Sequence, residues 1–206
     1  MKRAFDFVVS FLVILIALPL WFVVAMAIKL DSFGPVFFCG ERIGKGGNRF
    51  NIYKFRTMVV DASIRGPGIT HDHDRRITHV GRFLRKLKID EMPQLINVLR
   101  GEMSIVGPRP EDPRYVAKYT PEQRRVLGVR PGMASPAFIK YRHEEKVLTA
   151  ADGDPEHVYS NRILPDKLRM DLDYIQQQTF LFDLKVLVQA AISLFNSHSE
   201  PNQSKR

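Results

Sequence analysis

The chain has 206 residues, a formal net charge of +9 and a hydrophobic fraction of 45%. This length suits one domain, or one domain with an anchor, and the apolar fraction is sufficient for a packed core. Because Cys39 is the single cysteine, an intrachain disulfide is excluded. Residues 40–142 carry 21 Lys and Arg residues against 10 Asp and Glu residues. This basic segment favours an anionic partner, either a nucleic acid, a phospholipid or a phosphorylated substrate.

The N-terminal region predicts a membrane segment. Residues 7–28 are apolar apart from Ser10 and Pro19, and as a straight helix they would be about 33 Å long. A spanning helix, a re-entrant helix and a cleaved signal peptide all remain open. Only the re-entrant form keeps Lys2-Arg3 and the basic segment on the same side of the membrane, and Pro19 would supply its break. We also expect Arg3 and Asp6 to pair near the headgroups.

Two short strands are predicted next, over residues 36–39 and 50–55, with a loop at Gly44–Asn48 between them. The glycines of this loop are not followed by the Gly-Lys-Ser/Thr ending of a phosphate-binding loop, so we interpret them as a turn. Lys54 and Arg56 are two residues apart and would share one face of the second strand. They form either a solvated edge or a phosphate clamp.

A loop and a basic helix follow the hairpin. In the loop, the alternating run His71-Asp72-His73-Asp74 is a weak metal signal, so we expect a solvated loop, with a transition-metal site as the alternative. Residues 77–88 place apolar side chains at helical spacing and basic ones around them. This helix either lies on anionic lipid or packs on the core.

The adjacent acids Asp90 and Glu91 precede Pro93, which is suited to the first turn of a helix that ends near Gly101. A helix N-terminus favours ionised carboxylates. An ionised aspartate can attack phosphorus or bind a metal, and a neighbouring glutamate can hold Mg²⁺. From spacing alone, it is equally reasonable that the acids serve only as a helix cap and a dipole partner. A rigid Gly107-Pro108-Arg109-Pro110 turn then positions an arginine nearby.

The C-terminal region predicts a helix beginning at Pro165 and a mainly apolar segment over residues 184–195. The latter is too short to span a bilayer. It either packs in the core or lies in the membrane interface. Residues 197–206 are expected to form a flexible tail.

The block Lys88–Pro110 resembles the Asp-Glu-Leu-Pro-Gln-Leu to Val-Gly-Pro-Arg-Pro signature of the bacterial sugar transferase family, the monotopic phosphoglycosyl transferases, in their small, catalytic-domain-only form. Further blocks agree in order with the family: Lys2-Arg3-x-x-Asp6, Tyr53–Met58, Arg76–Thr78, Gly81–Arg85, Val129–Gly132 and Phe182–Leu187. The resemblance thus covers most of the chain. One departure, Ala134–Phe138, replaces a common family segment, and no family role is carried over to it.

This resemblance implies transfer of a phosphosugar from a UDP-sugar to a polyprenol phosphate, with release of UMP and a requirement for Mg²⁺. Asp90 would be the nucleophile that forms a covalent phosphosugar intermediate, and Glu91 would ligate Mg²⁺. Arg85 would hold phosphate, and Arg109, beside Pro108, would bind the nucleotide. Arg130, in the Val-Arg-Pro-Gly block, is a further candidate for substrate binding.

The implied fold is α+β and mainly helical, with a small β-hairpin and interfacial amphipathic helices around the active site. Its parts are a re-entrant membrane helix broken near Pro19 (1–30), a catalytic domain at the cytoplasmic face of the bacterial inner membrane (31–196) and the tail (197–206). Bilayer lipid is an expected partner, nucleic acid is not, and a homodimer stays open. The alternative function is a membrane-tethered module that binds anionic lipid or nucleic acid without catalysis.

Overall fold

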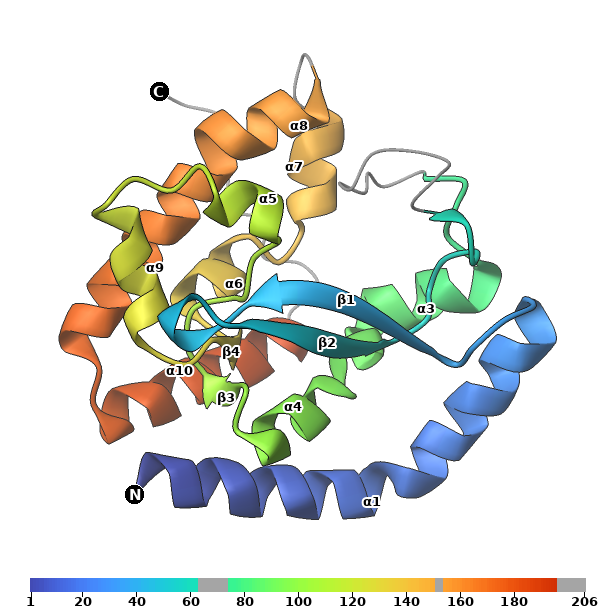
Figure 1. The fold of residues 1–206 in the computed structure, drawn as a ribbon. Coiled ribbons are helices and arrows are strands. Elements are labelled where there is room, and N and C mark those ends of the chain that lie inside the picture. Colours follow the sequence, from blue (N-terminus) through green and yellow to red (C-terminus); the bar gives the residue numbers. More distant parts are fainter. Residues whose placement is uncertain (63–73, 151–153, 196–206) are drawn as a thin grey trace.

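The computed structural model describes residues 1–62, 74–150 and 154–195. Within these ranges the fold is mainly helical with two small sheets, which confirms the predicted α+β class (Figure 1). The α-helices are α1 (Lys2–Asp31), α3 (His79–Leu87), α4 (Gln94–Arg100), α5 (Pro113–Val116), α6 (Pro136–Lys140), α7 (Glu144–Ala150), α8 (Pro155–Val158), α9 (Leu164–Gln177) and α10 (Phe180–Phe195). The strands are β1 (Phe37–Ile43), β2 (Arg49–Phe55), β3 (Ser104–Val106) and β4 (Gly132–Ala134). Short 3-10 or π turns are η1 (Lys45–Gly47), η2 (Ile89–Glu91), η3 (Gln123–Gly128) and η4 (Tyr159–Ile163).

Helix α1 is long and apolar enough to cross a membrane, and it contains Pro19. It runs without interruption from Lys2 to Asp31 but bends in its middle (Figure 1). The expected break is therefore a bend. Proline removes one backbone donor and crowds the preceding turn, yet the hydrogen bonds on either side can carry the helix through.

The N-terminal turns of α1 dock on the rest of the protein through polar side chains. Buried Asp6 accepts hydrogen bonds from Ser104 Oγ (2.8 Å) and from the Ile105 backbone N–H (3.2 Å). Arg3 donates to the carbonyl oxygens of Val98 and Leu99 at the end of α4. The predicted pairing of Arg3 with Asp6 is therefore wrong, because each side chain satisfies backbone or hydroxyl groups of residues 88–110 instead.

The outer face of α1 remains apolar and exposed in the structure. Its exposed side chains are Phe7, Val8, Phe11, Leu12, Val13, Leu15, Ile16, Leu18, Leu20, Phe22, Val23, Met26 and Leu30. The inner face packs through Trp21, which meets the ring of Phe55 edge-on at 5.6 Å. One continuous helix thus has one face packed on the protein and another with the composition that lipid requires.

Strands β1 and β2 form the predicted antiparallel hairpin, with Phe37 opposite Phe55 and Ile43 opposite Arg49. The observed β1 extends four residues beyond the predicted Cys39. Gly46, in the connecting turn, has φ 70°, which confirms the glycine loop as a turn and explains why it needs glycine.

Helices α3 and α4 bracket the acid pair. Thr78 caps α3 by accepting from the Gly81 N–H at 3.0 Å. Gly81 is required because a Cβ there would lie 2.1 Å from the Thr57 carbonyl oxygen. Helix α4 ends at Gly101 (φ 84°), as its sequence predicts. Leu84 of α3 is buried, and the exposed apolar residues of this helix are Phe83 and Leu87, so α3 packs on the core and also presents apolar side chains outward.

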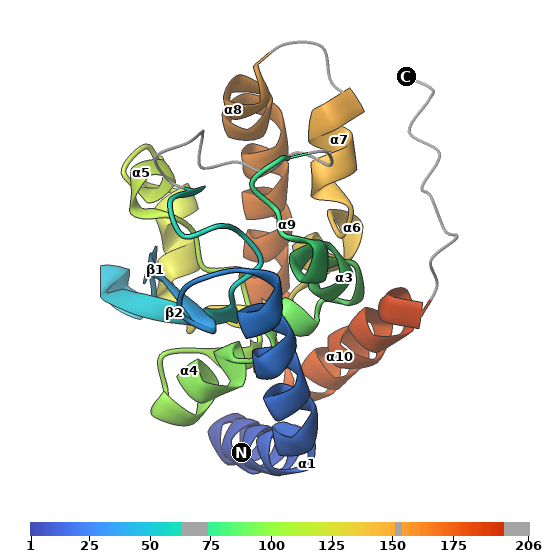
Figure 2. The same cartoon turned by 90° about the vertical axis from the view of Figure 1, so that its right-hand side faces the viewer.

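One core cluster lies between the parallel β3–β4 pair and the two C-terminal helices, and another joins α5, η3, η4 and α9. Pro165 stands in the first turn of α9, as predicted. Helix α10 buries Val186 and Ala190 while Leu181, Val188 and Ile192 are exposed, so it is partly a core helix and partly an apolar surface. Figure 2 shows α10 on the same side of the molecule as α1, and the rings of Phe5 and Phe180 are 5.3 Å apart. The tail, residues 197–206, lies outside the described residues.

Candidate active site

A cavity of about 250 Å³ contains the predicted acid pair. One side of it, which we call the dyad wall, consists of Lys54, Arg85, Asp90, Glu91 and Arg109. These residues come from β2, α3, η2 and the Gly107–Pro110 turn, and the left-handed Lys88 (φ 57°) between α3 and η2 turns the chain so that both acids are buried.

Glu91 is the centre of a buried ion-pair cluster. Its carboxylate accepts from Lys54 Nζ at 3.0 Å and from Arg109 through Nη1 at 3.0 Å and Nη2 at 2.5 Å. The two Arg109 contacts form a bidentate pair, which is the strongest geometry for arginine and carboxylate. Burial alone would raise the pKa of Glu91, but Arg109 and Lys54 outweigh burial and hold it well below its ordinary value. Glu91 is therefore ionised at neutral pH.

Asp90 has the opposite environment. It is 7% exposed, and its Oδ1 is buried without a hydrogen-bond partner. Burial raises the pKa of Asp90 and the charge of Glu91 adds to this, while Lys54, Lys88 and Arg85 act against it. Two adjacent acids whose pKa values are pushed apart have different chemical roles. Glu91 is held by cations, whereas Asp90 keeps a desolvated oxygen available for a new bond.

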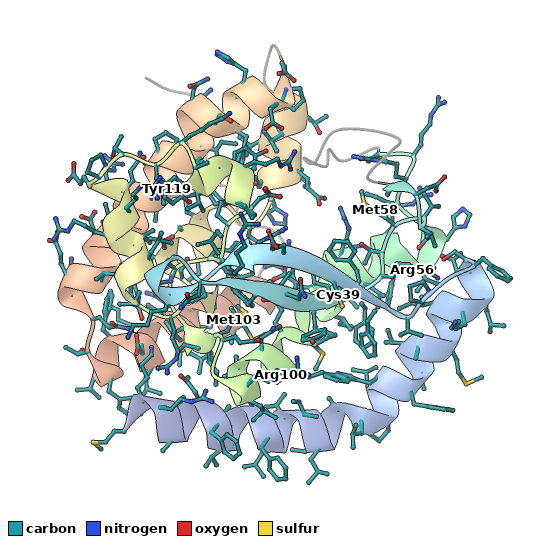
Figure 3. All side chains as sticks on the ribbon, viewed as in Figure 1. Cys39, Arg56, Met58, Arg100, Met103 and Tyr119 are labelled. Atoms are coloured by element: carbon teal, nitrogen blue, oxygen red, sulfur yellow. The ribbon has the colours of Figure 1, made fainter. Side chains whose placement is uncertain are left out.

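The side chains of Lys54 and Arg56 lie in different places, although the sequence predicts that they share one face of the strand. Lys54 lines the cavity, and burial lowers its pKa while Glu91 raises it. Arg56 lies past the end of β2 and donates to the Ser32 carbonyl oxygen (2.8 Å), Ser32 Oγ (3.0 Å) and the Phe33 carbonyl oxygen. Figure 3 labels Arg56 close to the C-terminal end of α1. The paired clamp is therefore not formed, because Arg56 satisfies orphan carbonyls where α1 ends.

Of the other predicted arginines, Arg85 lies in the cavity and Arg130 does not. Arg85 lines the cavity, with its Nε bound to Thr57 Oγ1 at 2.9 Å. Arg130 is exposed and donates to the Gly101 carbonyl oxygen at 2.9 Å, outside the cavity. Pro108 acts through its backbone: its carbonyl accepts from the Gly132 N–H at 2.7 Å, which holds the turn that carries Arg109.

The opposite side of the cavity was missed by sequence reasoning. This wall, which we call the α7 wall, consists of Tyr141, Glu144, Glu145, Tyr159 and Lys167. Lys167 Nζ donates to Glu144 Oε2 at 2.6 Å, and Tyr159 donates to Glu111 Oε2 at 2.5 Å. The π turn η4 that presents Tyr159 is a local signal of a functional site, but it is visible only in the structure.

The fit of this cavity to Mg²⁺ rests on two carboxylates. The described residues contain no group of three or more His, Cys, Asp or Glu side chains placed to hold a metal. Mg²⁺ does not need one, since it commonly takes one or two carboxylates and completes its shell with water and substrate phosphate. The unpartnered Asp90 Oδ1 and the neighbouring Glu91 provide such a pair. Of the predicted run His71–Asp74, residues 71–73 lie outside the described residues, and Asp74 forms an ion pair with Arg76 at 2.6 Å.

One family of known proteins matches nearly the whole chain. The family described as bacterial sugar transferase matches residues 1–197. The chain belongs to this family. Family membership and the apolar helix α1 together identify it as a membrane-associated protein.

Three relatives illustrate which proteins the chain is similar to. The undecaprenyl-phosphate glucose phosphotransferase of Komagataeibacter xylinus is 39% identical over 190 residues, which are 90% of the chain and 34% of the relative. A UDP-N-acetylgalactosamine-undecaprenyl-phosphate N-acetylgalactosaminephosphotransferase of Aeromonas hydrophila is 36% identical, over 90% of the chain and 41% of the relative. The UDP-glucose:undecaprenyl-phosphate glucose-1-phosphate transferase of Caulobacter vibrioides is 38% identical, over 95% of the chain and 70% of the relative. The chain thus spans less than half the length of the first two.

Proposed function

We propose that the protein transfers a phosphosugar from a UDP-sugar to a polyprenol phosphate, with undecaprenyl phosphate as the acceptor. The products are a polyprenyl diphosphate sugar and UMP, and the reaction is a first membrane step in making a polysaccharide or glycoconjugate. The names of the relatives support both substrates. A relative from Rhizobium leguminosarum, named as an exopolysaccharide production protein, is 34% identical over 94% of both chains and supports the pathway.

The single observation that carries this proposal is the free Oδ1 of Asp90, buried beside Glu91, which Lys54 and Arg109 bind. A carboxylate without hydrogen-bond donors or water keeps its lone pairs available for attack. Burial and Glu91 raise the pKa of Asp90, and the nearby cations on Lys54, Lys88 and Arg85 act against this and attract an approaching phosphate. The arrangement thus supports Asp90 as the nucleophile and Glu91 as the charge-holding residue, two roles that spacing alone does not separate.

In the first step, an oxygen of Asp90 bonds to the β-phosphorus of the donor, and the bond from that phosphorus to the bridging oxygen breaks. The bridging oxygen and its electron pair leave with UMP. In the second step, a phosphate oxygen of the polyprenol phosphate bonds to the same phosphorus and Asp90 leaves as a carboxylate. No oxidant is needed, and both steps balance without net proton transfer between protein and product.

The cations of the dyad wall would bind and orient the phosphates. Arg109 and Lys54 hold Glu91 in place, and Arg85 presents its guanidinium to the cavity. Mg²⁺, held by Glu91 with Asp90 beside it, would supply neutralisation of phosphate charge during transfer. Arg109 also lies over the Phe138 ring at 5.6 Å, and this contact fixes its direction from the side of α6.

For topology, we propose that α1 enters and leaves one leaflet, which makes the protein monotopic with its active site on the cytoplasmic face of the inner membrane. The bend in α1 and the docking of Asp6 and Arg3 on residues 88–110 support this arrangement. With both ends of α1 attached to the same domain, a lipid phosphate at the membrane surface is within reach of the cavity.

The proposal is tested by turnover. The protein in nanodiscs is incubated with Mg²⁺, undecaprenyl phosphate and a panel of UDP-sugars, and UMP release is measured. We expect UMP release with at least one sugar. Without the acceptor, release should stop after a single turnover, and without Mg²⁺ there should be none. A folded protein that releases no UMP with any sugar would instead be a non-catalytic binding module.

A further inference from the structure

Arg85 is held on two sides in the substrate-free protein. Its Nε donates to Thr57 Oγ1 at 2.9 Å, and its Nη1 donates to Glu145 Oε1 at 2.9 Å. The Thr57 contact comes from the segment that follows β2, and it fixes the direction of the guanidinium. The Glu145 contact comes from α7, on the far wall of the cavity. A carboxylate therefore occupies the part of Arg85 that is best suited to bind a phosphate.

The neighbouring residue ties α7 to a different helix. Glu144 accepts from Lys167 Nζ of α9 at 2.6 Å, while Glu145 binds Arg85 of α3. The first turn of α7 is thus attached to both sides of the cavity. Leu148 is the one buried residue of this helix and Val147 packs against the same core, so the helix is attached by apolar contacts near its end and by ionic contacts in its first turn. Figures 1 and 2 place α7 at the end of the molecule opposite the N-terminal half of α1.

The two ion pairs differ in how easily they can open. Lys167 is 9% exposed at its side chain, whereas Glu145 is 41% exposed and Arg85 is 20% exposed. Ion pairs in contact with water contribute little to stability, so the Arg85–Glu145 pair is the weaker of the two. It can exchange Glu145 for a stronger anion at small cost.

The cavity is also small for a nucleotide sugar in the substrate-free protein. Its volume of about 250 Å³ is below the roughly 300–1,000 Å³ of pockets that enclose a drug-sized ligand. A nucleotide sugar is at least that large. The α7 wall is the side of the cavity held by the weaker contacts, because the dyad wall has the buried Glu91 cluster.

We propose that Glu145 is an internal competitor for Arg85, and that α7 is a clasp which a substrate phosphate opens by displacing this carboxylate. This inference rests on the proposed function, because it takes the ligand of Arg85 to be a phosphate. The exchange involves hydrogen bonds alone. Glu145 thereby sets the affinity of the cavity for its anionic substrate and reduces occupation by weaker anions.

The test measures binding of UDP, and separately of inorganic pyrophosphate, to the full chain in nanodiscs by calorimetry. We expect Glu145→Gln to bind both probes about two- to five-fold more tightly than the wild type, since it removes an exposed competing ion pair. The matched control Glu122→Gln removes the same charge from an exposed site outside the cavity and should bind like the wild type. Equal or weaker binding by Glu145→Gln overturns the clasp.

An Arg85→Gln background separates the clasp from a general charge effect. There, Glu145→Gln should give no further gain, and a gain that persists contradicts competition through Arg85. Hydrogen exchange of the wild type gives a readout without mutation: amides 144–150 should exchange faster when either probe is bound, and unchanged or slower exchange contradicts release of α7. Binding of pyrophosphate but not UDP, with the predicted gain, keeps the clasp and rejects the UDP-sugar donor. Binding of neither probe rejects both.

Discussion

The two walls of the cavity use the same kinds of charged side chain in different ways. On the dyad wall, Glu91 is 8% exposed and is bound by both Arg109 and Lys54. On the α7 wall, the side chain of Glu145 is 41% exposed and is bound by Arg85 across the cavity. A buried cluster keeps its geometry because breaking it strands a charge, whereas an exposed pair exchanges partners readily. The comparison indicates a fixed chemical side and a side that adapts.

Changing the arginine of the buried cluster should have the largest effect on this comparison. Arg109→Lys removes the bidentate contact with Glu91, because lysine has a single ammonium and no planar fork. We expect kcat/KM for the UDP-sugar to fall about 100-fold, equivalent to about 2.7 kcal/mol of lost transition-state binding. Steady-state UMP release over a range of donor concentrations measures it.

Arg130→Lys is the matched control, because Arg130 is exposed and contacts the Gly101 carbonyl outside the cavity. It should change kcat/KM less than about three-fold. Equal losses in the two variants would mean that placement in the cavity does not decide which arginine serves the reaction. The dyad wall would then have no special status.

A smaller effect is expected from Asp171, a buried residue that lies near Arg109 of the dyad wall and Lys167 of the α7 wall. This residue of α9 is 4% exposed and is hydrogen-bonded by Ser135 and by the Arg109 backbone N–H. Burial raises its pKa to about 7, against the opposing effects of Ser135 and Lys167. A carboxyl whose pKa is raised binds more protons folded than unfolded, so the free energy of unfolding falls as pH rises from about 4 to about 7.

Asp171→Asn should remove this slope. Relative to the wild type, the thermal midpoint of the variant should therefore rise by several degrees between pH 5 and pH 8, which corresponds to at most about 3 kcal/mol. Differential scanning fluorimetry in detergent across this range measures the shift. The neighbouring exposed Asp173→Asn is the control and should follow the wild-type slope. Parallel curves for all three proteins would mean that Asp171 keeps an ordinary pKa in the folded state.

The sequence predicts the features that are determined by nearby residues, and it misses those that depend on contacts between distant parts of the chain. Pro93 and Gly101 act within their own helix, so the position of α4 beside the acids was predictable. Both strands of the hairpin were predictable for the same reason, apart from the extra length of β1. Arg56 shows the limit, because its partners are backbone carbonyls 23 and 24 residues earlier in the chain. No local pattern signals such a contact.

The α7 wall was even less predictable, because its ion pairs join residues that are far apart in the sequence. Arg85 meets Glu145 across 60 residues, and Lys167 meets Glu144 across 23. Neither pair has a distinguishing spacing, and both glutamates look like ordinary first-turn residues of a short helix. The roles of Asp90 and Glu91 are intermediate: the sequence shows two adjacent acids, but the structure is needed to show that one is paired with cations and the other has an oxygen without a partner.

The central claim is that the unpartnered oxygen of Asp90 is the nucleophile. Its most direct test is mass spectrometry of the intact and digested protein after incubation with Mg²⁺ and the preferred UDP-sugar, with acceptor lipid withheld. We predict a phosphosugar adduct on Asp90 that disappears when undecaprenyl phosphate is added and is absent in Asp90→Asn. An adduct on another residue, or turnover by Asp90→Asn, would contradict the account.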